Sequence, residues 1–209
     1  PAIAWQTVTA EAEVDADLVA IAAEATRLQN SGKFADAANQ WEKIVSTNPD
    51  WSKAGVAWLN LGICRVSMGK FQQAFEPLKK SLQASGTPID TPKGLMFLGY
   101  AQMNYGNQLS MSTDETDLKN SSIYLTTATQ TLGRIVNKFP EFELSDQALY
   151  FRGQSFYKLD RLDDAIEAFQ KVTENPDATF RKDAFFDLAT AWQRQGKISL
   201  ADSAYDSFL

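Results

Sequence analysis

Residues 58–78 read WLNLGICRVSMGKFQQAFEPL and contain the pattern that decides the fold. A stretch with helical periodicity carries the small residue Gly62, and a short turn follows at Gly69. A second helical stretch then carries Ala74, with Leu78 four residues later. Glycine suits the left-handed conformation at which many helices end, and small residues suit the places where two helices approach closely. The stretch therefore predicts two helices packed against each other as a hairpin.

Small residues recur at these two places along the chain. The spacing is 36 or 37 residues, except for one gap of 54 residues in each series. The first series is Ala25, Gly62, Gly99, Gly153 and Ala189, and the second is Ala37, Ala74, Ala128, Ala165 and Ala201. Because the first series keeps its spacing up to Gly99 and the second keeps it from Ala128 onward, 17 extra residues lie between these two positions. A fixed period of this length is typical of repeat proteins. We therefore predict an all-α solenoid of about five helical hairpins, with an insertion inside the third.

The predicted hairpins occupy about residues 18–50, 55–88, 92–141, 146–177 and 182–209, and the insertion occupies about residues 107–122. Residues 1–17 lie outside the repeat and form either an N-terminal arm or the start of the first helix. The last hairpin ends at Leu209 without a polar capping helix, which solenoids need over an exposed apolar edge. We therefore expect this chain to be a fragment of a longer protein, or its end to be covered by a partner.

The composition argues against several classes of function. The 209 residues include no histidine, one cysteine (Cys64) and 20 Lys and Arg against 26 Asp and Glu, for a net charge of -6. Without histidine there is no Ser-His-Asp triad and no His-ligated zinc, and one cysteine makes no internal disulfide. An acidic chain lacks the basic surface of nucleic-acid binders, and no apolar run is long enough to cross a bilayer. We expect a protein that is not an enzyme, carries no cofactor or metal and binds no nucleic acid.

The repeats resemble the tetratricopeptide repeat (TPR), whose pattern is W-x2-L-G-x2-Y, then A-x3-F, then P. The second hairpin has Trp58, Leu61 and Gly62 of this pattern, with Arg65 in place of the usual aromatic residue and Leu78 in place of Phe. The matching positions of the fourth hairpin are Gly153, Phe156, Ala165, Phe169 and Pro176. The resemblance covers roughly residues 18–209. It implies a right-handed superhelix whose first helices line a concave groove that binds a protein or peptide partner.

The third to fifth hairpins are similar to a TPR variant found in bacterial envelope proteins. The similarity lies in Phe139-Pro140, in residues 153–157 (GQSFY) and in residues 165–172 (AIEAFQKV). It favours a bacterial periplasm or cell envelope over the cytoplasm.

The resemblance also implies which side chains face the groove, because ligand-facing positions lie one turn either side of the small residue in each first helix. The partner-binding residues that it implies are Lys93, Met96, Tyr100, Met103, Tyr150, Gln154, Tyr157, Phe186 and Arg194. Tyrosine combines contact area with a polar tip, and methionine adapts its shape, so both suit peptide capture. In the alternative interpretation these side chains fill gaps between neighbouring first helices.

Two more specific kinds of site, a carboxylate clamp and a calcium loop, have little support in the sequence. Some TPR domains grip a C-terminal carboxylate with a basic clamp; Asn60 and Lys93 fit two of its positions, but the other three do not match. In the insertion, residues 113–117 (TDETD) lack the spacing and the glycine of a calcium loop. We predict instead that Asp117 caps a helix that resumes near Leu118.

Three functions therefore remain. The first is an interaction module without catalytic activity that binds a peptide or protein along the groove. The alternative is a spacer or assembly scaffold that positions other domains or self-associates through its uncapped C-terminal edge. The third is an accessory domain of an enzyme whose catalytic part lies beyond Leu209.

Overall fold

The computed structural model describes the backbone of residues 2–84 and 90–208, and the side chains of residues 14–84 and 91–208. Within these ranges every regular element is a helix, as the repeat pattern predicts. The helices are α1 (Ala2–Asn30), α2 (Phe34–Thr47), α3 (Ala54–Ser67), α4 (Phe71–Gln83), α5 (Asp90–Leu109), α6 (Glu115–Lys138), α7 (Ser145–Lys158), α8 (Leu162–Glu174), α9 (Arg181–Arg194) and α10 (Ile198–Phe208). None of these described helices is both long and apolar enough to cross a lipid bilayer. The chain forms two compact units, Pro1–Phe97 and Leu98–Leu209.

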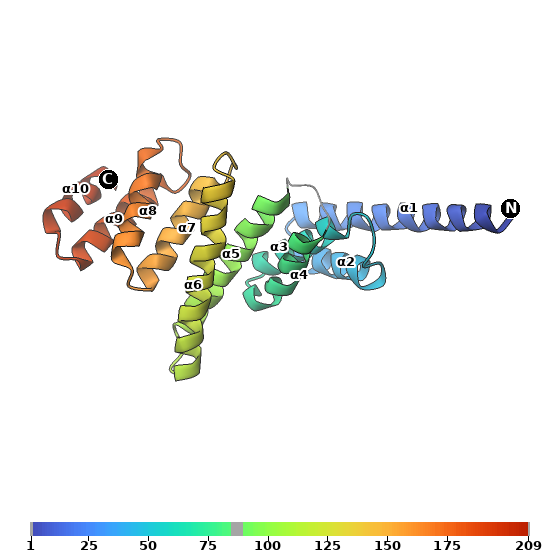
Figure 1. The fold of residues 1–209 in the computed structure, drawn as a ribbon, viewed down its shortest axis with the longest axis horizontal. Helices are drawn as coiled ribbons and strands as arrows, with labels where there is room; N and C mark the ends of the chain where they lie inside the picture. Colours follow the sequence, from blue (N-terminus) through green and yellow to red (C-terminus); the bar gives the residue numbers. More distant parts are fainter. Residues whose placement is uncertain (1, 85–89, 209) are drawn as a thin grey trace. The chain divides into compact units, whose positions relative to one another are not determined.

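In the N-terminal unit, each helix from α1 to α4 packs against the next along the chain. Its core is built from small and large apolar side chains, among them Ala25, Trp41 and Leu61. The structure places residues 2–17 in the same helix as residues 18–30, so α1 has 29 residues where α2 has 14. Figure 1 shows α1 extending well past the end of α2.

The small residues lie where the two helices of a hairpin meet. A Cβ atom added to Gly62 would lie 2.5 Å from Leu78 Cγ, and one added to Gly153 would lie 2.7 Å from Phe169 Cε1. In the third hairpin the corresponding distance from Gly99 to Leu132 is 2.6 Å. Contacts this short leave room for a hydrogen atom only, so these glycines let a large apolar side chain pack directly on the backbone of the first helix.

The turns between paired helices also have the glycine conformation that the sequence predicts. Gly32, Gly69 and Gly196 have φ values of 75°, 71° and 76°, the left-handed conformation expected of a glycine at a helix C-terminus. In the fourth hairpin Asp160 takes this place with φ of 60°. Aspartate is one of the few other residues that tolerate this conformation.

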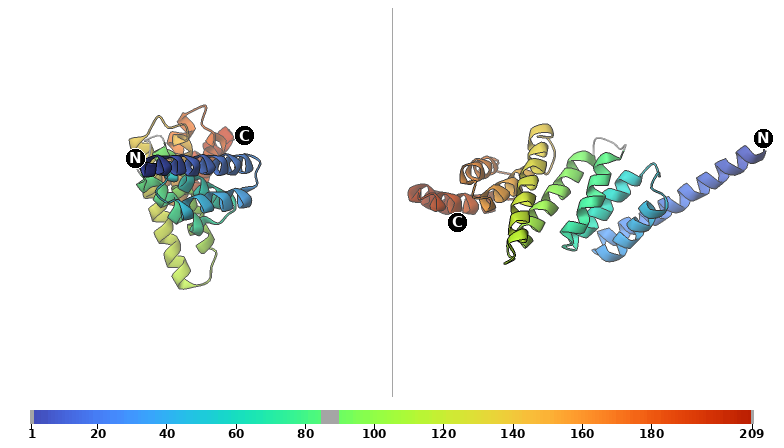
Figure 2. Two further views of the ribbon diagram at one scale, coloured as in Figure 1. Left: turned by 90° about the vertical axis from the view of Figure 1, so that its right-hand side faces the viewer. Right: turned by 60° about the horizontal axis from the view of Figure 1, so that its bottom comes forward.

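The extra residues of the third hairpin lengthen both of its helices. α5 has 20 residues where α3, α7 and α9 have 14, and α6 has 24 where α4 and α8 have 13. Compared with the fourth hairpin, α5 has five more residues after Gly99, the turn has two more, and α6 has ten more before Ala128, which together make the 17-residue interruption. Figures 1 and 2 show α5 and α6 side by side, with their tip projecting beyond α7 and α8.

The prediction of the helix cap in this hairpin was wrong. The cap is Asp114, whose carboxylate accepts hydrogen bonds from the backbone N–H groups of Thr116 (2.8 Å) and Asp117 (3.1 Å). These bonds lower the pKa of Asp114 below its usual value. α6 therefore begins at Glu115, three residues before Leu118, because Asp114 has the extended backbone of a capping residue and Asp117 is already helical.

Replacing Gly153 tests the close contact within a hairpin. Gly153→Ala should lower the free energy of unfolding by about 1–3 kcal/mol, because the new methyl group overlaps the rigid ring of the buried Phe169. Urea denaturation measures the loss. In the double variant with Phe169→Leu, the loss should be smaller than the sum of the two single losses. Additive losses would show that the two residues do not compete for the same space.

Candidate partner-binding site

The C-terminal unit has a hollow of about 260 Å³ whose lining residues come from four helices. Three of these helices, α5, α7 and α9, are the first helices of successive hairpins, and we call the surface they form the first-helix face. The lining residues are Asn107, Gln154, Tyr157, Lys158, Phe169, Asp187 and Thr190. The buried Phe169 of α8 contributes an apolar wall, and the other side chains are polar or carry a polar tip.

Three polar side chains from α7 and α9 meet at this hollow. The Tyr150 hydroxyl donates a hydrogen bond to Asp187 Oδ2 (2.9 Å), and Gln154 Nε2 lies 2.9 Å from the Tyr150 hydroxyl and 3.3 Å from the same carboxylate oxygen. Burial raises the pKa of Asp187 above its usual value, although both hydrogen bonds act in the opposite direction. The negative charge of Asp183, one helical turn earlier, raises that pKa further.

Tyr150 is held in place by aromatic packing. Its ring stacks on Phe180 at 4.7 Å with an interplanar angle of 9°, and it also contacts Phe151 and Phe169. Only 6% of the residue is exposed. Burial, together with the Asp187 charge, raises the pKa of Tyr150 well above its usual range, so its hydroxyl remains a hydrogen-bond donor. The ring is part of the core, and the hydroxyl fixes the position of the Asp187 carboxylate.

Tyr157 and Arg194 form a second polar group beside the hollow. The Arg194 guanidinium lies 5.2 Å from the centre of the Tyr157 ring and pairs with Asp160 at 3.0 Å. Tyr157 is half-buried, and both members of the ion pair are partly exposed. This stacked arginine offers a planar cation at the surface, which suits contact with a polar segment of a partner.

The other residues implied by the family resemblance are buried, partly buried or exposed. Met96 and Met103 are only 5% and 3% exposed, so they pack within their own units. Tyr100 is partly buried against Phe151, with ring centres 5.0 Å apart. Lys93 is exposed, and Phe186 is 46% exposed while its ring contacts Tyr205 and Phe208. Partner contact by this whole set stays a prediction, and its solvent-accessible members are the ones that a ligand would reach first.

Sequence reasoning missed Asp187, the central acceptor of the site. The signal that could have found it is the repeat period, because Asp187 follows Tyr150 by 37 residues. Residues one period apart occupy equivalent positions on neighbouring first helices, and such positions face each other when hairpins stack in phase.

The first-helix side of the N-terminal unit holds a different group. Gln29 Oε1 accepts a hydrogen bond from Trp41 Nε1 (3.2 Å), and Gln29 Nε2 donates to Asn60 Oδ1 (3.4 Å). Asn60 is thus engaged within the protein. The Cys64 thiol donates weakly to the same glutamine oxygen at 3.5 Å and is fully buried, which raises its pKa to about 11. This thiol is protonated at neutral pH, consistent with a small core residue.

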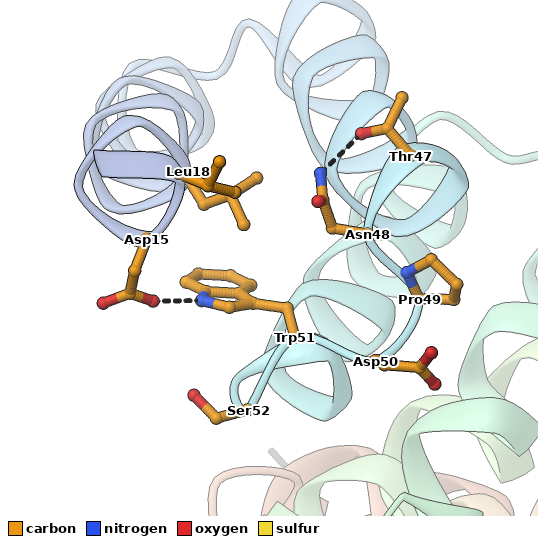
Figure 3. Close-up of a pocket in the computed structure, with 9 residues that line it drawn as sticks. Asp15, Leu18, Thr47, Asn48, Pro49, Asp50, Trp51 and Ser52 are labelled. Carbon is orange, nitrogen blue, oxygen red and sulfur yellow. Dashed lines mark hydrogen bonds between the residues drawn. The ribbon is translucent and has the colours of Figure 1, made fainter. Parts of the chain in front are cut away.

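A larger hollow, of about 680 Å³, opens at the edge of the N-terminal unit. It lies between α1 and the turn that joins α2 to α3, and Figure 3 shows Trp51 reaching from this turn toward α1. Trp51 Nε1 donates a hydrogen bond to Asp15 Oδ1 at 2.6 Å, beside Leu18. Much of the wall of this hollow comes from residues 47–52, at the end of α2 and in the turn. The smaller hollow is the candidate site, because it brings side chains of three first helices together around a partly buried carboxylate.

The tip of the α5–α6 hairpin is a third exposed feature. Met111 at the tip is 79% exposed, and Leu118 and Ile123 on α6 are 43% and 53% exposed. Tyr105 and Tyr124 brace the two helices, with their ring centres 4.8 Å apart in an edge-on arrangement. No three metal-binding side chains come together in the part of the chain whose side chains are described, this tip included.

Comparison with known proteins identifies the family and the fold. The tetratricopeptide repeat profile matches residues 22–87 and 131–179, more than half of the chain. The structure is similar to a MamA fragment from Desulfovibrio magneticus RS-1, at 15% identity and a TM-score of 0.71 over 91% of this chain and 92% of that one. It is also similar to YrrB, described as a TPR protein with an unusual peptide-binding site, at 19% identity and a TM-score of 0.64 over 96% and 89% of the two chains.

A third similar structure is a thermophilic TPR protein from Thermus thermophilus, at 18% identity and a TM-score of 0.60 over 92% and 90% of the two chains. At these identities the structures establish the shared fold. A comparison of the sequence with curated proteins finds no match.

The partly buried carboxylate of Asp187 should make the stability of the protein depend on pH. The folded-state pKa of Asp187 lies above its unfolded value. Its charge therefore costs no stability below the unfolded pKa, costs more as the pH rises from the unfolded to the folded pKa, and has its full cost above the folded pKa. Asp187→Asn should therefore unfold at a higher temperature than the parent at pH 7, and the difference should shrink below about pH 4, near the reference pKa of aspartate. Thermal melts followed by circular dichroism measure the unfolding temperatures of the variant and the parent at each pH. A variant less stable than the parent at pH 7 would contradict this description of the site.

Proposed function

The chain belongs to the tetratricopeptide repeat family and is a protein–protein interaction module, and we propose that it binds an extended peptide or protein segment along the first-helix face of its C-terminal unit. Members of this family bind protein or peptide partners. Our proposal adds the place of binding, the residues that contact the partner and the absence of catalysis.

One observation carries the proposal: the hollow lined by residues of α5, α7 and α9, with Gln154, Tyr157 and Asp187 around it. A site of this kind, concave and with a few polar groups converging on an apolar wall, is the usual form of a binding site. Helix backbones leave few free hydrogen-bonding groups, so a bound segment would be recognised through side chains. Gln154 and Tyr157 supply polar tips from two successive turns of α7.

The surroundings of the hollow extend this contact surface. Phe186 offers an exposed apolar ring one residue before Asp187, and Arg194 offers a cation stacked on Tyr157. Aromatic and arginine side chains contribute much of the energy at protein interfaces, usually through a few anchors. The solvent-accessible members of the predicted set in this unit are thus of the right types.

The proposal of a binding role without catalysis is supported by the chemistry of the described side chains. The sequence has no histidine, and the single thiol, Cys64, is buried with a pKa of about 11. The Tyr150 hydroxyl is held as a donor by Asp187 and is not activated as a nucleophile. The similarity to YrrB, whose description names a peptide-binding site, points in the same direction.

The alternative role, self-association into a scaffold, rests on exposed apolar side chains of α10. Ile198 and Leu200 are 54% and 47% exposed. Exposed apolar residues that lie together can mark an interface. Light scattering over a concentration series distinguishes the two roles, since a stoichiometric oligomer without ligand supports the scaffold and a monomer that binds peptide supports the module.

Two glutamines of the C-terminal unit test the proposed place of binding. The probe is a fluorescein-labelled peptide selected against this chain from a random dodecapeptide library. Gln154→Ala should weaken binding of this peptide by about tenfold, because that loss is typical of removing one interface anchor. Gln130→Ala is the matched control, because Gln130 is exposed on the second helix α6. Fluorescence anisotropy measures both affinities, and circular dichroism checks that both variants stay helical. Equal affinities for the two variants would place the peptide elsewhere.

A further inference from the structure

The Asp187 carboxylate has a free oxygen at the hollow. Both hydrogen bonds from Tyr150 and Gln154 reach Oδ2, whereas Oδ1 accepts none from the residues that the structure describes. Tyr150 is fixed by its stacking on Phe180, so the carboxylate is held in one position. A fixed acceptor with one unused oxygen is a preorganised point for a hydrogen-bond donor.

No cation neutralises this carboxylate among the residues whose side chains the structure describes. Among the side chains described, no Lys or Arg nitrogen lies within ion-pair distance of Asp187. Of the two arginines on α9, Arg181 donates to the Thr173 carbonyl and Arg194 pairs with Asp160. Lys158 lines the same hollow without pairing with Asp187. A partly buried charge without a counter-ion is unfavourable for the free protein. Its cost is relieved when a positive group arrives.

The rest of the hollow suits the side chain that carries such a group. The Tyr157 ring and the Phe169 wall offer apolar surface for an alkyl stem, and aromatic rings also attract cations. Thr190 and the Gln154 side-chain oxygen are further acceptors at the hollow for the several N–H donors of an ammonium or guanidinium group. A volume of about 260 Å³ is the size of one side-chain pocket and smaller than a typical site for a drug-sized ligand.

We propose that this hollow is a specificity subsite that takes one Lys or Arg side chain of the bound segment, with Asp187 as its counter-ion. This inference rests on the proposed function, and it adds that the groove selects segments with a Lys or Arg at one position. Asp183, exposed one turn before Asp187, adds negative charge on the same helix and attracts the same ligands.

Peptide selection tests the subsite. Panning a random dodecapeptide library against the parent chain should enrich Lys or Arg at one fixed position of the aligned binders. The same panning against Asp187→Asn should lose that enrichment. Asp202→Asn is the matched control, because Asp202 is an exposed aspartate on the second helix α10 and its replacement changes the net charge equally. With this control the enrichment should persist.

One selected peptide then gives the affinity. Replacing its enriched basic residue by norleucine should weaken binding to the parent chain and to Asp202→Asn by at least about tenfold, and to Asp187→Asn by less than about twofold. Binders without a fixed basic position, or equal losses in all three proteins, would overturn the subsite while leaving groove binding intact. A library that yields no binder to the parent chain would overturn both proposals.

Discussion

The contact between a glycine on the first helix of a hairpin and a large apolar side chain on the second helix sets the rest of the structure. An added Cβ atom at Gly62, Gly99 or Gly153 would lie only 2.5–2.7 Å from the partner side chain. Because these three hairpins close on this contact, the two helices of each have one relative position, and in the C-terminal unit the equivalent positions of α7 and α9 face each other. That alignment brings Tyr150 and Asp187, one repeat apart, to within hydrogen-bond distance.

The third hairpin shows that the glycine contact is compatible with much longer helices. The close contact of Gly99 with Leu132 is kept, although the two residues are 33 positions apart where the equivalent pairs are 16 apart. Toward the tip a second glycine, Gly106, packs on Leu125, and the Ser121 hydroxyl donates to the Gly106 carbonyl at 2.8 Å. The added residues thus extend the helix pair by its own packing, and α6 still packs against α7.

The periodic part of the structure could be predicted from the sequence, and the site could be predicted only in part. Small residues and turn glycines act locally, so the hairpins, their phase and the position of the insertion follow from spacing. Burial depends on contacts between hairpins, which is why Met103 and the Tyr150 ring lie in the core although their positions match the groove. Asp187 was missed because its role depends on Tyr150 in another hairpin. The cap is Asp114 and not Asp117 because Asp114 has the extended backbone of a capping residue, which the sequence pattern does not specify.

The site combines a rigid scaffold with an unfavourable charge. Aromatic packing fixes Tyr150, Tyr150 fixes Asp187, and the free protein supplies no cation for that carboxylate among its described side chains. Proteins often keep such costly groups where they bind.

The most direct measurement is a crystal structure of this chain with a selected peptide. The account predicts that the peptide crosses α7 and α9 and contacts Gln154 and Tyr157, and a peptide seated on α8 and α10 would contradict it.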